Sequence, residues 1–250
     1  MEPKDRIIVA LDVDTPEKAL SLVRDLAPHV GCFKIGLEFI TAMLASLITA
    51  QSDEEAGSIF RVIRELFRLL DGNVLWDGKF ADIPNTVGGA SAQIDRMHLK
   101  MFNVHASAGP EAIAKAVAGK GKSLVLGVTV LTSIDGDMCR SIFGKDPGEK
   151  VLQFADWLVD AGADGIICSS KELDVLAGAG VSRDLLRVTP GIRPQWAVKG
   201  DQKRVMTPAD AIKAGANYLV IGRPIREPPK EIGSPVDAAK KIAEEIASVV

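Results

Sequence analysis

The chain reads Val74-Leu75-Trp76-Asp77-Gly78-Lys79-Phe80-Ala81-Asp82-Ile83-Pro84-Asn85-Thr86 near the end of its first third. This stretch begins as an apolar run typical of a β-strand and then places three charged residues, Asp77, Lys79 and Asp82, close together. Side chains two apart in a strand point to the same side, so we expect Asp77 and Lys79 to project together from one strand end. Asp82 lies beyond that end, in a turn before a helix whose entry Pro84 and Thr86 suit.

Charged side chains on one face of a buried strand have two interpretations. Burying a charge is costly unless the charge is paired or used in chemistry. Asp77 and Lys79 alone fit an ion pair that fixes the strand end as well as they fit a functional site. The addition of Asp82 and of Ile83-Pro84-Asn85-Thr86 favours the functional site.

Length and composition limit the class of protein. A chain of 250 residues suits one (β/α)8 barrel, although two small domains are compatible with the length alone. Hydrophobic residues make up 47% and charged residues 25% of the chain, as in ordinary globular proteins. The net charge of -3, without a basic block, argues against nucleic acid as a partner. A phosphorylated ligand therefore needs a local basic site.

We expect no secretory signal core among the N-terminal residues. The N-terminal residues are polar, and no apolar run of about 18 residues could form a membrane span, so we expect no membrane partner. Cys32, Cys139 and Cys168 lie far apart and lack CxxC spacing. We therefore expect reduced thiols that are buried as small hydrophobic side chains, and a cytoplasmic protein.

Eight strand-like runs alternate with helical runs along the chain. They are Arg6 to Leu11, Gly31 to Ile35, Asn73 to Lys79, Lys100 to His105, Ser123 to Val130, Asp164 to Cys168, Leu185 to Thr189 and Asn217 to Ile221. The runs are almost uninterruptedly apolar, as in strands buried on both faces. The alternation predicts an α/β protein with a parallel sheet, and eight units predict a closed (β/α)8 TIM barrel. A doubly wound open sheet is the alternative, but its usual glycine-rich first turn is missing.

We expect a single barrel domain over residues 1-250, since no linker or repeat interrupts the chain. The segment after Gly36 is longer than a barrel crossover needs, and we interpret about 37-72 as a helical insertion. Ser52 and Glu55 form a capping-box pattern, so a second helix is expected to begin there. Residues 131 to 147 are expected to form a loop.

Polar residues gather where the predicted strands end. The chemistry of a (β/α)8 barrel lies at the carboxyl ends of its strands. The residues at those ends are Asp12, Lys34, Asp77, Lys79, Thr132, Ser133, Arg193 and Arg223. Each one alone fits a cap, a turn or a solvated surface position. Together on one rim they predict an active site.

The loops after the last two strands predict a phosphate site. They read Thr189-Pro190-Gly191-Ile192-Arg193-Pro194 and Ile221-Gly222-Arg223-Pro224. Glycine lets backbone N–H groups approach a phosphate, and arginine binds phosphate oxygens bidentately. Gly200-Asp201-Gln202, between the two loops, is a candidate lid. The alternative is two turns with solvated arginines.

A metal site is not indicated by the sequence. His29, His98 and His105 lack the spacing of metal ligands, and no Walker, GxSxG or HExxH motif is present. We interpret His105, near a strand end, as a hydrogen-bonded structural histidine. No cofactor motif is present either.

Several of these segments together resemble one enzyme family. The pattern Asp-x-Lys-x-x-Asp-Ile-Pro-Asn-Thr at 77–86 resembles the signature of orotidine 5'-phosphate decarboxylases, which catalyse the last step of de novo UMP synthesis. Other similar blocks follow the same order along nearly the whole chain. They are Ala10-Leu11-Asp12, Phe33-Lys34-Ile35-Gly36, Asn103-Val104-His105-Ala106-Ser107, Val130-Leu131-Thr132-Ser133, Pro190-Gly191-Ile192-Arg193, Gly200-Asp201-Gln202 and Ile221-Gly222-Arg223-Pro224.

The resemblance implies cofactor-free decarboxylation of orotidine 5'-monophosphate (OMP) to UMP. Lys79 is expected to protonate C6 of the pyrimidine, and Lys34, Asp77 and Asp82 to complete an alternating charge array around it. The implied substrate-binding residues are Asp12 and Lys34 at the ribose, Thr132 at the pyrimidine edge, and Arg193, Gln202, Gly222 and Arg223 at the phosphate. Asp82, Ile83 and Thr86 are expected to come from the neighbouring subunit of a homodimer with shared active sites.

The sequence departs from the family pattern at two positions, and two other functions compete. Gly78 stands where the family usually has a larger apolar residue, and Ala81 where bacterial relatives often have histidine.

One rival function is that of Mg²⁺-dependent sugar-phosphate lyases similar to 3-hexulose-6-phosphate synthase or 3-keto-gulonate-6-phosphate decarboxylase. Those enzymes usually carry an acidic residue at the position of Lys34. The other rival is a catalytically silent barrel that only binds phosphorylated ligands.

Overall fold

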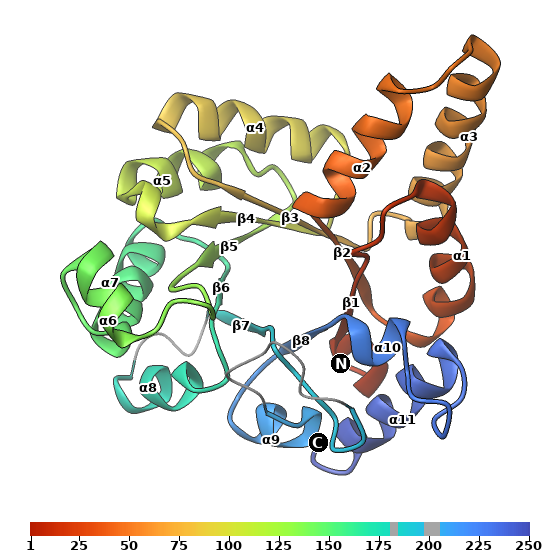
Figure 1. The fold of residues 1–250 in the computed structure, drawn as a ribbon. Coiled ribbons are helices and arrows are strands. Elements are labelled where there is room, and N and C mark those ends of the chain that lie inside the picture. The colour runs from red at the N-terminus through yellow and green to blue at the C-terminus, as the bar shows by residue number, and fades with distance from the viewer. Residues whose placement is uncertain (181–184, 198–205) are drawn as a thin grey trace.

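The computed structural model describes residues 1–180, 185–197 and 206–250. Eight parallel strands close into a barrel in sequence order, with β8 pairing with β1 (Figure 1). The strands are β1 (Ile7–Ala10), β2 (Cys32–Gly36), β3 (Val74–Phe80), β4 (Met101–His105), β5 (Leu124–Val128), β6 (Gly165–Ile167), β7 (Leu186–Thr189) and β8 (Tyr218–Ile221). The predicted (β/α)8 barrel is confirmed, and the open sheet is wrong.

Helices form the outer layer around the strands (Figure 1). They are α1 (Pro16–Leu26), α2 (Leu37–Ile48), α3 (Asp53–Leu70), α4 (Pro84–Arg96), α5 (Pro110–Gly119), α6 (Gly136–Phe143), α7 (Pro147–Asp160), α8 (Glu172–Gly178), α9 (Pro208–Lys213), α10 (Arg223–Arg226) and α11 (Pro235–Ala247). Short 3₁₀ turns add η1 (Pro3–Arg6), η2 (Ala27–His29) and η3 (Ala106–Ala108). No helix of the described residues is long and apolar enough to cross a membrane.

Alternate residues of the strands point into the barrel, where an apolar cluster fills the interior. It contains Ile8, Ala10, Cys32, Leu75, Met101, Leu126, Val188, Tyr218 and Val220. Strand neighbours such as Ile7 and Val9 belong instead to the cluster beneath the helices. The strands are therefore buried on both faces, as their apolar runs predict. Continuing the inward alternation toward the carboxyl ends leads to polar residues, among them Asp12, Lys34 and Asp77.

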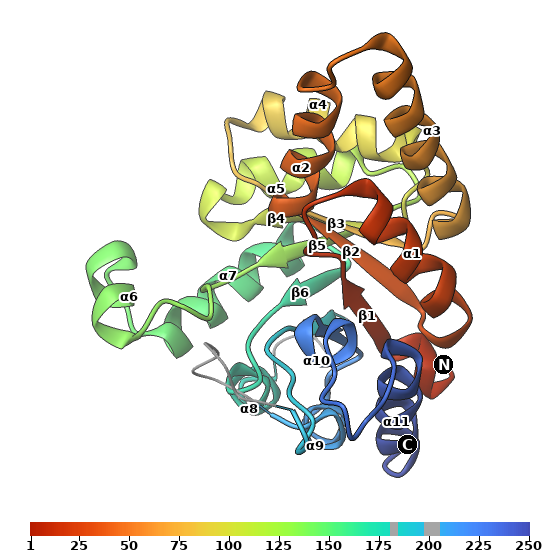
Figure 2. The same cartoon turned by 45° about the vertical axis from the view of Figure 1, so that its right-hand side comes forward.

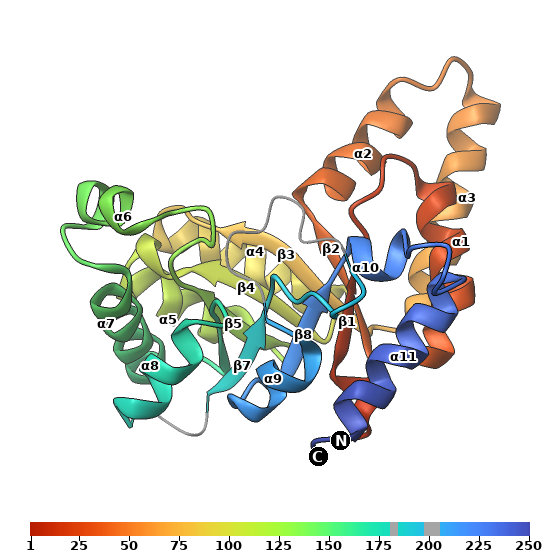
Figure 3. The same ribbon diagram turned by 60° about the horizontal axis from the view of Figure 1, so that its bottom comes forward.

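Two helices connect β2 to β3. Figure 3 shows α2 and α3 leaning away from the barrel, whereas both chain termini lie at its opposite end. Helix α3 begins after Ser52, whose hydroxyl accepts a hydrogen bond from the Glu55 N–H at 3.1 Å. The Glu55 carboxylate accepts from the Gln51 N–H at 2.6 Å instead of from Ser52. The predicted second helix is thus present, with half of the expected capping box.

Three local elements differ from the sequence-based expectation. The segment from 131 to 147 is not only a loop, because it contains α6, which stands apart from the barrel in Figure 2. The Asp135 carboxylate accepts from the Met138 N–H at 3.0 Å at its start, and Gly144 with φ 71° ends it. Helix α4 begins at Pro84, two residues before the helix that the sequence predicts over roughly Thr86 to Leu99. The short α10 begins directly after Gly222, where no helix is expected.

Candidate active site

A cavity of about 190 Å³ lies at the carboxyl ends of the strands. Lys34, Asp77 and Lys79 line one side of it. The remaining lining is mainly apolar, with Val128, Ile167, Val220 and Pro190 from β5 to β8 and their following loops. Thr132 and Ser169 add hydroxyl groups. The cavity therefore combines a charged wall with an apolar one, which suits a flat heterocyclic ligand that carries a charge at one edge.

Strand β3 is irregular where it supplies the charged wall. Its register against β4 pairs Trp76 with Phe102 and then Phe80 with Val104. Three residues of β3, from Asp77 to Lys79, therefore lie opposite one residue of β4, Asn103. Lys79 has a φ of 48°, in the left-handed region that lysine rarely adopts. The prediction that Asp77 and Lys79 meet at the strand end is confirmed, because their side chains form an ion pair. They meet through a bulge, however, and not through a regular strand.

Four charged side chains form a continuous row across three strands. The Lys34 Nζ donates to Asp12 Oδ1 at 2.8 Å and lies 3.3 Å from Asp77 Oδ2. The Lys79 Nζ donates to Asp77 Oδ1 at 2.7 Å. The signs alternate from Asp12 through Lys34 and Asp77 to Lys79. Each buried charge therefore has an opposite neighbour, which offsets part of its desolvation cost.

The row changes the pKa values of its central members. Burial tends to raise the pKa of Asp77, but the charges of Lys34 and Lys79 and two hydrogen bonds outweigh it and leave that pKa below its usual value. Burial tends to lower the pKa of Lys34, but Asp77 and Asp12 outweigh it and leave that pKa raised. Asp77 is therefore an anion and Lys34 a cation at neutral pH.

Asn103 is a buried member of the site whose role was not predicted from the sequence. It is fully buried on β4, where its Nδ2 donates to Asp77 Oδ1 at 2.6 Å. Its Oδ1 accepts from the backbone N–H of Lys79 at 2.7 Å. A sequence signal existed, because an asparagine within the apolar run from Met101 to Val104 needs buried partners.

The phosphate end is formed by the loops after β7 and β8. Arg193 is 9% exposed, and burial together with the nearby charge of Arg223 lowers its pKa. A buried guanidinium whose charge is disfavoured by a neighbouring one suits an anionic ligand. Gly222 faces the Ala10 and Asp12 side chains, 3.5 and 4.0 Å from the position of a Cβ. Gln202 and the candidate lid Gly200-Asp201-Gln202 lie outside the described residues.

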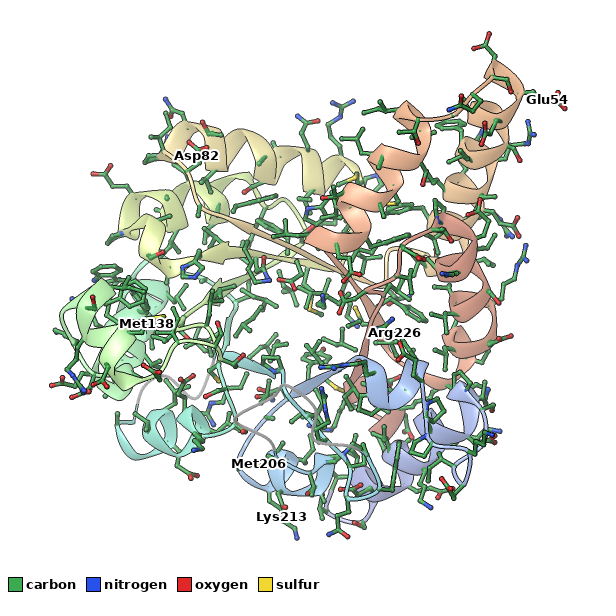
Figure 4. All side chains as sticks on the ribbon, in the orientation of Figure 1. Glu54, Asp82, Met138, Met206, Lys213 and Arg226 are labelled. Atoms are coloured by element: carbon green, nitrogen blue, oxygen red, sulfur yellow. The ribbon has the colours of Figure 1, made fainter. Side chains whose placement is uncertain are left out.

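Helix α10 connects the phosphate end to the row of charges. Arg226, labelled in Figure 4, donates to the backbone carbonyl of Asp12 at 2.5 Å. The side chain of Arg226 is only 12% exposed. Nothing in the local sequence singles out Arg226 as a site residue. The contact spans most of the chain and becomes visible only when β8 pairs with β1.

Asp82, Ile83 and Thr86 do not join the row within one chain. Figure 4 shows Asp82 at the start of α4, away from the middle of the barrel. All three residues are exposed, Ile83 by 66%. Among the described residues, the Asp82 carboxylate accepts from the Ile83 N–H at 2.7 Å and forms no ion pair with Lys79. The expected array around Lys79 is therefore incomplete in a single subunit.

His105 ends β4 beside this site. Its Nδ1 lies 2.7 Å from the Ser107 Oγ, which fits the expected hydrogen-bonded histidine. Burial and the charge of Lys79 lower its pKa, so the ring is neutral at neutral pH. The described residues contain no cluster of three or more His, Cys, Asp and Glu side chains able to hold a metal ion.

Comparison with known proteins gives consistent matches along the whole chain. Residues 5–242 match the model of the orotidine 5'-phosphate decarboxylase / HUMPS family. The chain is 42% identical to the orotidine 5'-phosphate decarboxylase of Heliobacterium modesticaldum, with 99% of this chain and 98% of that protein covered. It is 40% identical to that of Moorella thermoacetica, with 100% and 95% covered. The crystal structure of orotidine 5'-phosphate decarboxylase from Lactobacillus acidophilus has a TM-score of 0.75 at 30% identity, covering 96% of this chain and 98% of that one.

Proposed function

The chain belongs to the orotidine 5'-phosphate decarboxylase / HUMPS family and is a carboxy-lyase, and from this premise we propose that it converts OMP to UMP and CO₂ in de novo pyrimidine biosynthesis. The observation that carries the proposal is the row of alternating charges Asp12, Lys34, Asp77 and Lys79, of which the last three line the cavity and Asp12 is paired with Lys34 behind them. A site that only binds a nucleotide has no need of four charges paired in a row whose central members are buried.

The chemistry requires stabilisation of negative charge on carbon. When the bond from C6 to the carboxylate breaks, CO₂ leaves and the electron pair stays on C6, which has no adjacent carbonyl group to delocalise it. A fixed ammonium group stabilises this charge without a cofactor. In this proposal Lys79 supplies the ammonium and then transfers a proton to C6, which completes UMP. Asp77 fixes its position through the 2.7 Å ion pair.

The remaining contacts follow the shape of a nucleotide. Asp12 lies next to Gly222, and Lys34 is paired with Asp12 at 2.8 Å. The two side chains suit the ribose hydroxyls, because a carboxylate accepts hydrogen bonds and an ammonium donates them. Arg193, Gln202, Arg223 and the Gly222 backbone bind the phosphate. Thr132 meets the pyrimidine edge beside the apolar wall. Binding energy from the phosphate then organises the charged row, so a substrate without phosphate is expected to lose kcat as well as affinity.

Lys34 argues against the metal-dependent relatives that share this family. Its ammonium lies between the Asp12 and Asp77 carboxylates, at 2.8 and 3.3 Å. These are the oxygen ligands that a divalent cation in the barrel mouth would use. The lysine charge occupies that position and raises the cost of bringing a second cation there.

We propose a homodimer in which each subunit completes the other's site. Asp82, Ile83 and Thr86 are exposed and separated from Lys79 of their own chain, which leaves them available to a neighbour. Helix α2 also exposes Leu37, Leu44 and Ile48, by 58%, 57% and 72%. The spacing of these three residues places them on one face of the helix, and such an apolar stripe supports contact with a second copy.

The cysteines support a reducing compartment for this enzyme. Cys32, Cys139 and Cys168 are buried and unbridged. Burial raises the pKa of Cys32 to about 12 and raises that of Cys168 as well, so both stay as unreactive thiols. We propose that the protein acts in the cytoplasm.

The proposal is tested by the ultraviolet absorbance change of OMP with purified protein, with and without excess EDTA. We expect conversion to UMP that is indifferent to EDTA. Lys79→Ala is expected to reduce kcat/KM about 10³-fold or more, through loss of several kcal/mol of transition-state stabilisation. Wild-type kcat/KM in that variant would refute the role of Lys79. Activity on ketose phosphates that requires Mg²⁺ would instead support the sugar-phosphate lyase. Binding of UMP without turnover of OMP would support the catalytically silent barrel.

A further inference from the structure

We infer that Asn103 is a positioning residue of the proposed decarboxylase, holding the Lys79 backbone and the Asp77 carboxylate in their working arrangement. This inference rests on the proposed function. Asn103 faces the irregular end of β3, where three residues of that strand lie opposite one residue of β4. It is fully buried, and both ends of its amide group are hydrogen-bonded to the charged wall.

The first contact supports an unfavourable backbone conformation. A bulge removes residues from the regular ladder and leaves their backbone groups to find other partners. The N–H of Lys79 donates to the Asn103 Oδ1 at 2.7 Å. Lys79 has a φ of 48°, which costs a residue with a side chain some stability and persists only where its surroundings enforce it. Asn103 is the side chain that satisfies this strained amide.

The second contact orients the anion between the two lysines. The Asn103 Nδ2 donates to Asp77 Oδ1 at 2.6 Å, and the Lys79 Nζ donates to the same oxygen at 2.7 Å. The other oxygen, Oδ2, is left facing Lys34 at 3.3 Å. The amide therefore fixes which carboxylate oxygen each lysine meets. One side chain controls both the backbone and the counter-ion of the proposed acid.

The amide cannot be replaced by its closest isosteres without losing part of this role. Leucine has a similar size and provides neither hydrogen bond. Aspartate keeps an acceptor for the Lys79 N–H but places a second carboxylate beside Asp77. Two adjacent carboxylates share one proton at low pH, and the protonated form can again donate to Asp77. The ionisable residues that Asn103 contacts are Asp77 and Lys79, and the ionisable residues that interact with those two are Lys34 and His105.

The experiment compares Asn103→Leu and Asn103→Asp with wild type, using kcat on OMP, the Kd of UMP and the dependence of kcat on pH. We expect Asn103→Leu to lose at least about 100-fold in kcat while the Kd of UMP changes less than about threefold. For Asn103→Asp we expect kcat relative to wild type to recover as the pH falls, because the carboxyl group becomes a donor. Asn103→Leu is expected to show no such recovery.

Ser123→Ala is the matched control. Ser123 is also buried beside β4, and its hydroxyl donates to the Leu99 carbonyl at 2.6 Å, away from the cavity. Its variant is expected to lose thermal stability and keep kcat. A kcat within about threefold of wild type in Asn103→Leu would overturn the inference. So would an Asn103→Leu variant that loses kcat and UMP affinity by the same factor, if Ser123→Ala shows the same losses. Inactive wild-type protein would overturn the proposed function itself, and the inference with it.

Discussion

Asp77 is the residue on which the charged wall depends, because it accepts hydrogen bonds from Lys79 and Asn103 and faces Lys34. A buried carboxylate without such partners would be strongly destabilising. With them, it is held as an anion, and its pKa lies below the usual 3.8. Asp77 therefore contributes to the stability of the fold as well as to the proposed catalysis. Its contribution to stability is expected to depend on pH.

Asp77→Asn is expected to change how stability depends on pH. A carboxylate with a lowered pKa contributes stability that is fully present above 3.8 and is lost as the pH falls through its value in the folded protein. Lys34 has the opposite sign, because its raised pKa contributes stability below 10.5 that is lost as the pH rises further. Wild type is therefore expected to have a higher Tm than Asp77→Asn near neutrality, and the difference is expected to shrink below about pH 4. A Tm difference that stays constant on acidification would contradict this.

Ser169 is a second residue whose environment predicts an effect on binding. It is 1% exposed, lines the cavity, and its hydroxyl has no hydrogen-bond partner among the described residues. Ser169→Ala is expected to leave the Tm unchanged or raised, because it removes an unsatisfied polar group. If the hydroxyl meets the pyrimidine, the Kd of UMP weakens about tenfold or less while that of ribose 5-phosphate stays the same. Ser170→Ala, equally buried but outside the cavity lining, is the control, and equal weakening of both ligands would exclude a ring contact.

At the scale of single elements, β3 shows where sequence reasoning succeeded and failed. The apolar run followed by charged residues predicted the strand and its charged end, and both are present. It did not predict the bulge, because the extra residues are accommodated by β4 and by Asn103, which the local sequence does not specify. Gly78 departs from the family pattern, and its position explains this: a Cβ there would lie 3.0 Å from both the Phe80 and the Trp76 rings. These two rings occupy the space that a larger side chain at position 78 would need.

The junction of β2 and α2 gives a prediction for Gly36. A Cβ at this position would lie 2.6 Å from the Lys34 Nζ and 3.4 Å from Asp12 Oδ1. The clash is with the end of a flexible side chain, so Gly36→Ala is expected to fold and to displace the ammonium from Asp12 and Asp77. We expect kcat/KM on OMP to fall about 10- to 100-fold with little change in Tm.

Gly57→Ala in α3 is the control for this substitution. Its Cβ would meet only the Arg61 Nη1 at 3.7 Å, an ordinary contact. We expect unchanged kcat/KM and a stability gain of about 0.5–1 kcal/mol, as for glycine replacement inside a helix. If Gly36→Ala keeps wild-type kcat/KM, the Lys34 position does not matter for catalysis. If it fails to fold, the displacement is not confined to the side chain.

At the scale of the whole molecule, the barrel could be predicted because eight apolar runs and eight helical segments leave few other arrangements. The sequence also predicted that the loops of Arg193 and Arg223 lie together, and the Arg223 charge lowers the pKa of Arg193 beside the paired strands β7 and β8. The contact of Arg226 with the Asp12 carbonyl could not be predicted, because it depends on the closure of the sheet between β8 and β1. Gln202 lies outside the described residues and its role stays a prediction. The same holds for the single-domain interpretation with an insertion at about 37-72.

The shared site of the proposed homodimer gives the sharpest prediction at this scale. Lys79→Ala and Asp82→Ala are each expected to be nearly inactive alone. When equal amounts of the two variants are unfolded together and refolded, half of the dimers are mixed. If Asp82 serves the neighbouring site, a mixed dimer has one site with both defects and one with neither. The mixture is therefore expected to recover about a quarter of wild-type activity on OMP, measured after size-exclusion chromatography confirms dimers.

The control pairs Lys79→Ala with Lys34→Ala. Both residues line the same cavity in one chain, and both contact Asp77. Every site of a mixed dimer then carries one defect, so no recovery is expected. Recovery in this control would mean that Lys34 or Lys79 also contributes to the site of the neighbouring subunit. If mixed dimers form and Asp82→Ala gives no recovery, Asp82 acts on the site of its own chain. Helix α4 would then have to move, because Asp82 is exposed and is not paired with Lys79 in the single subunit.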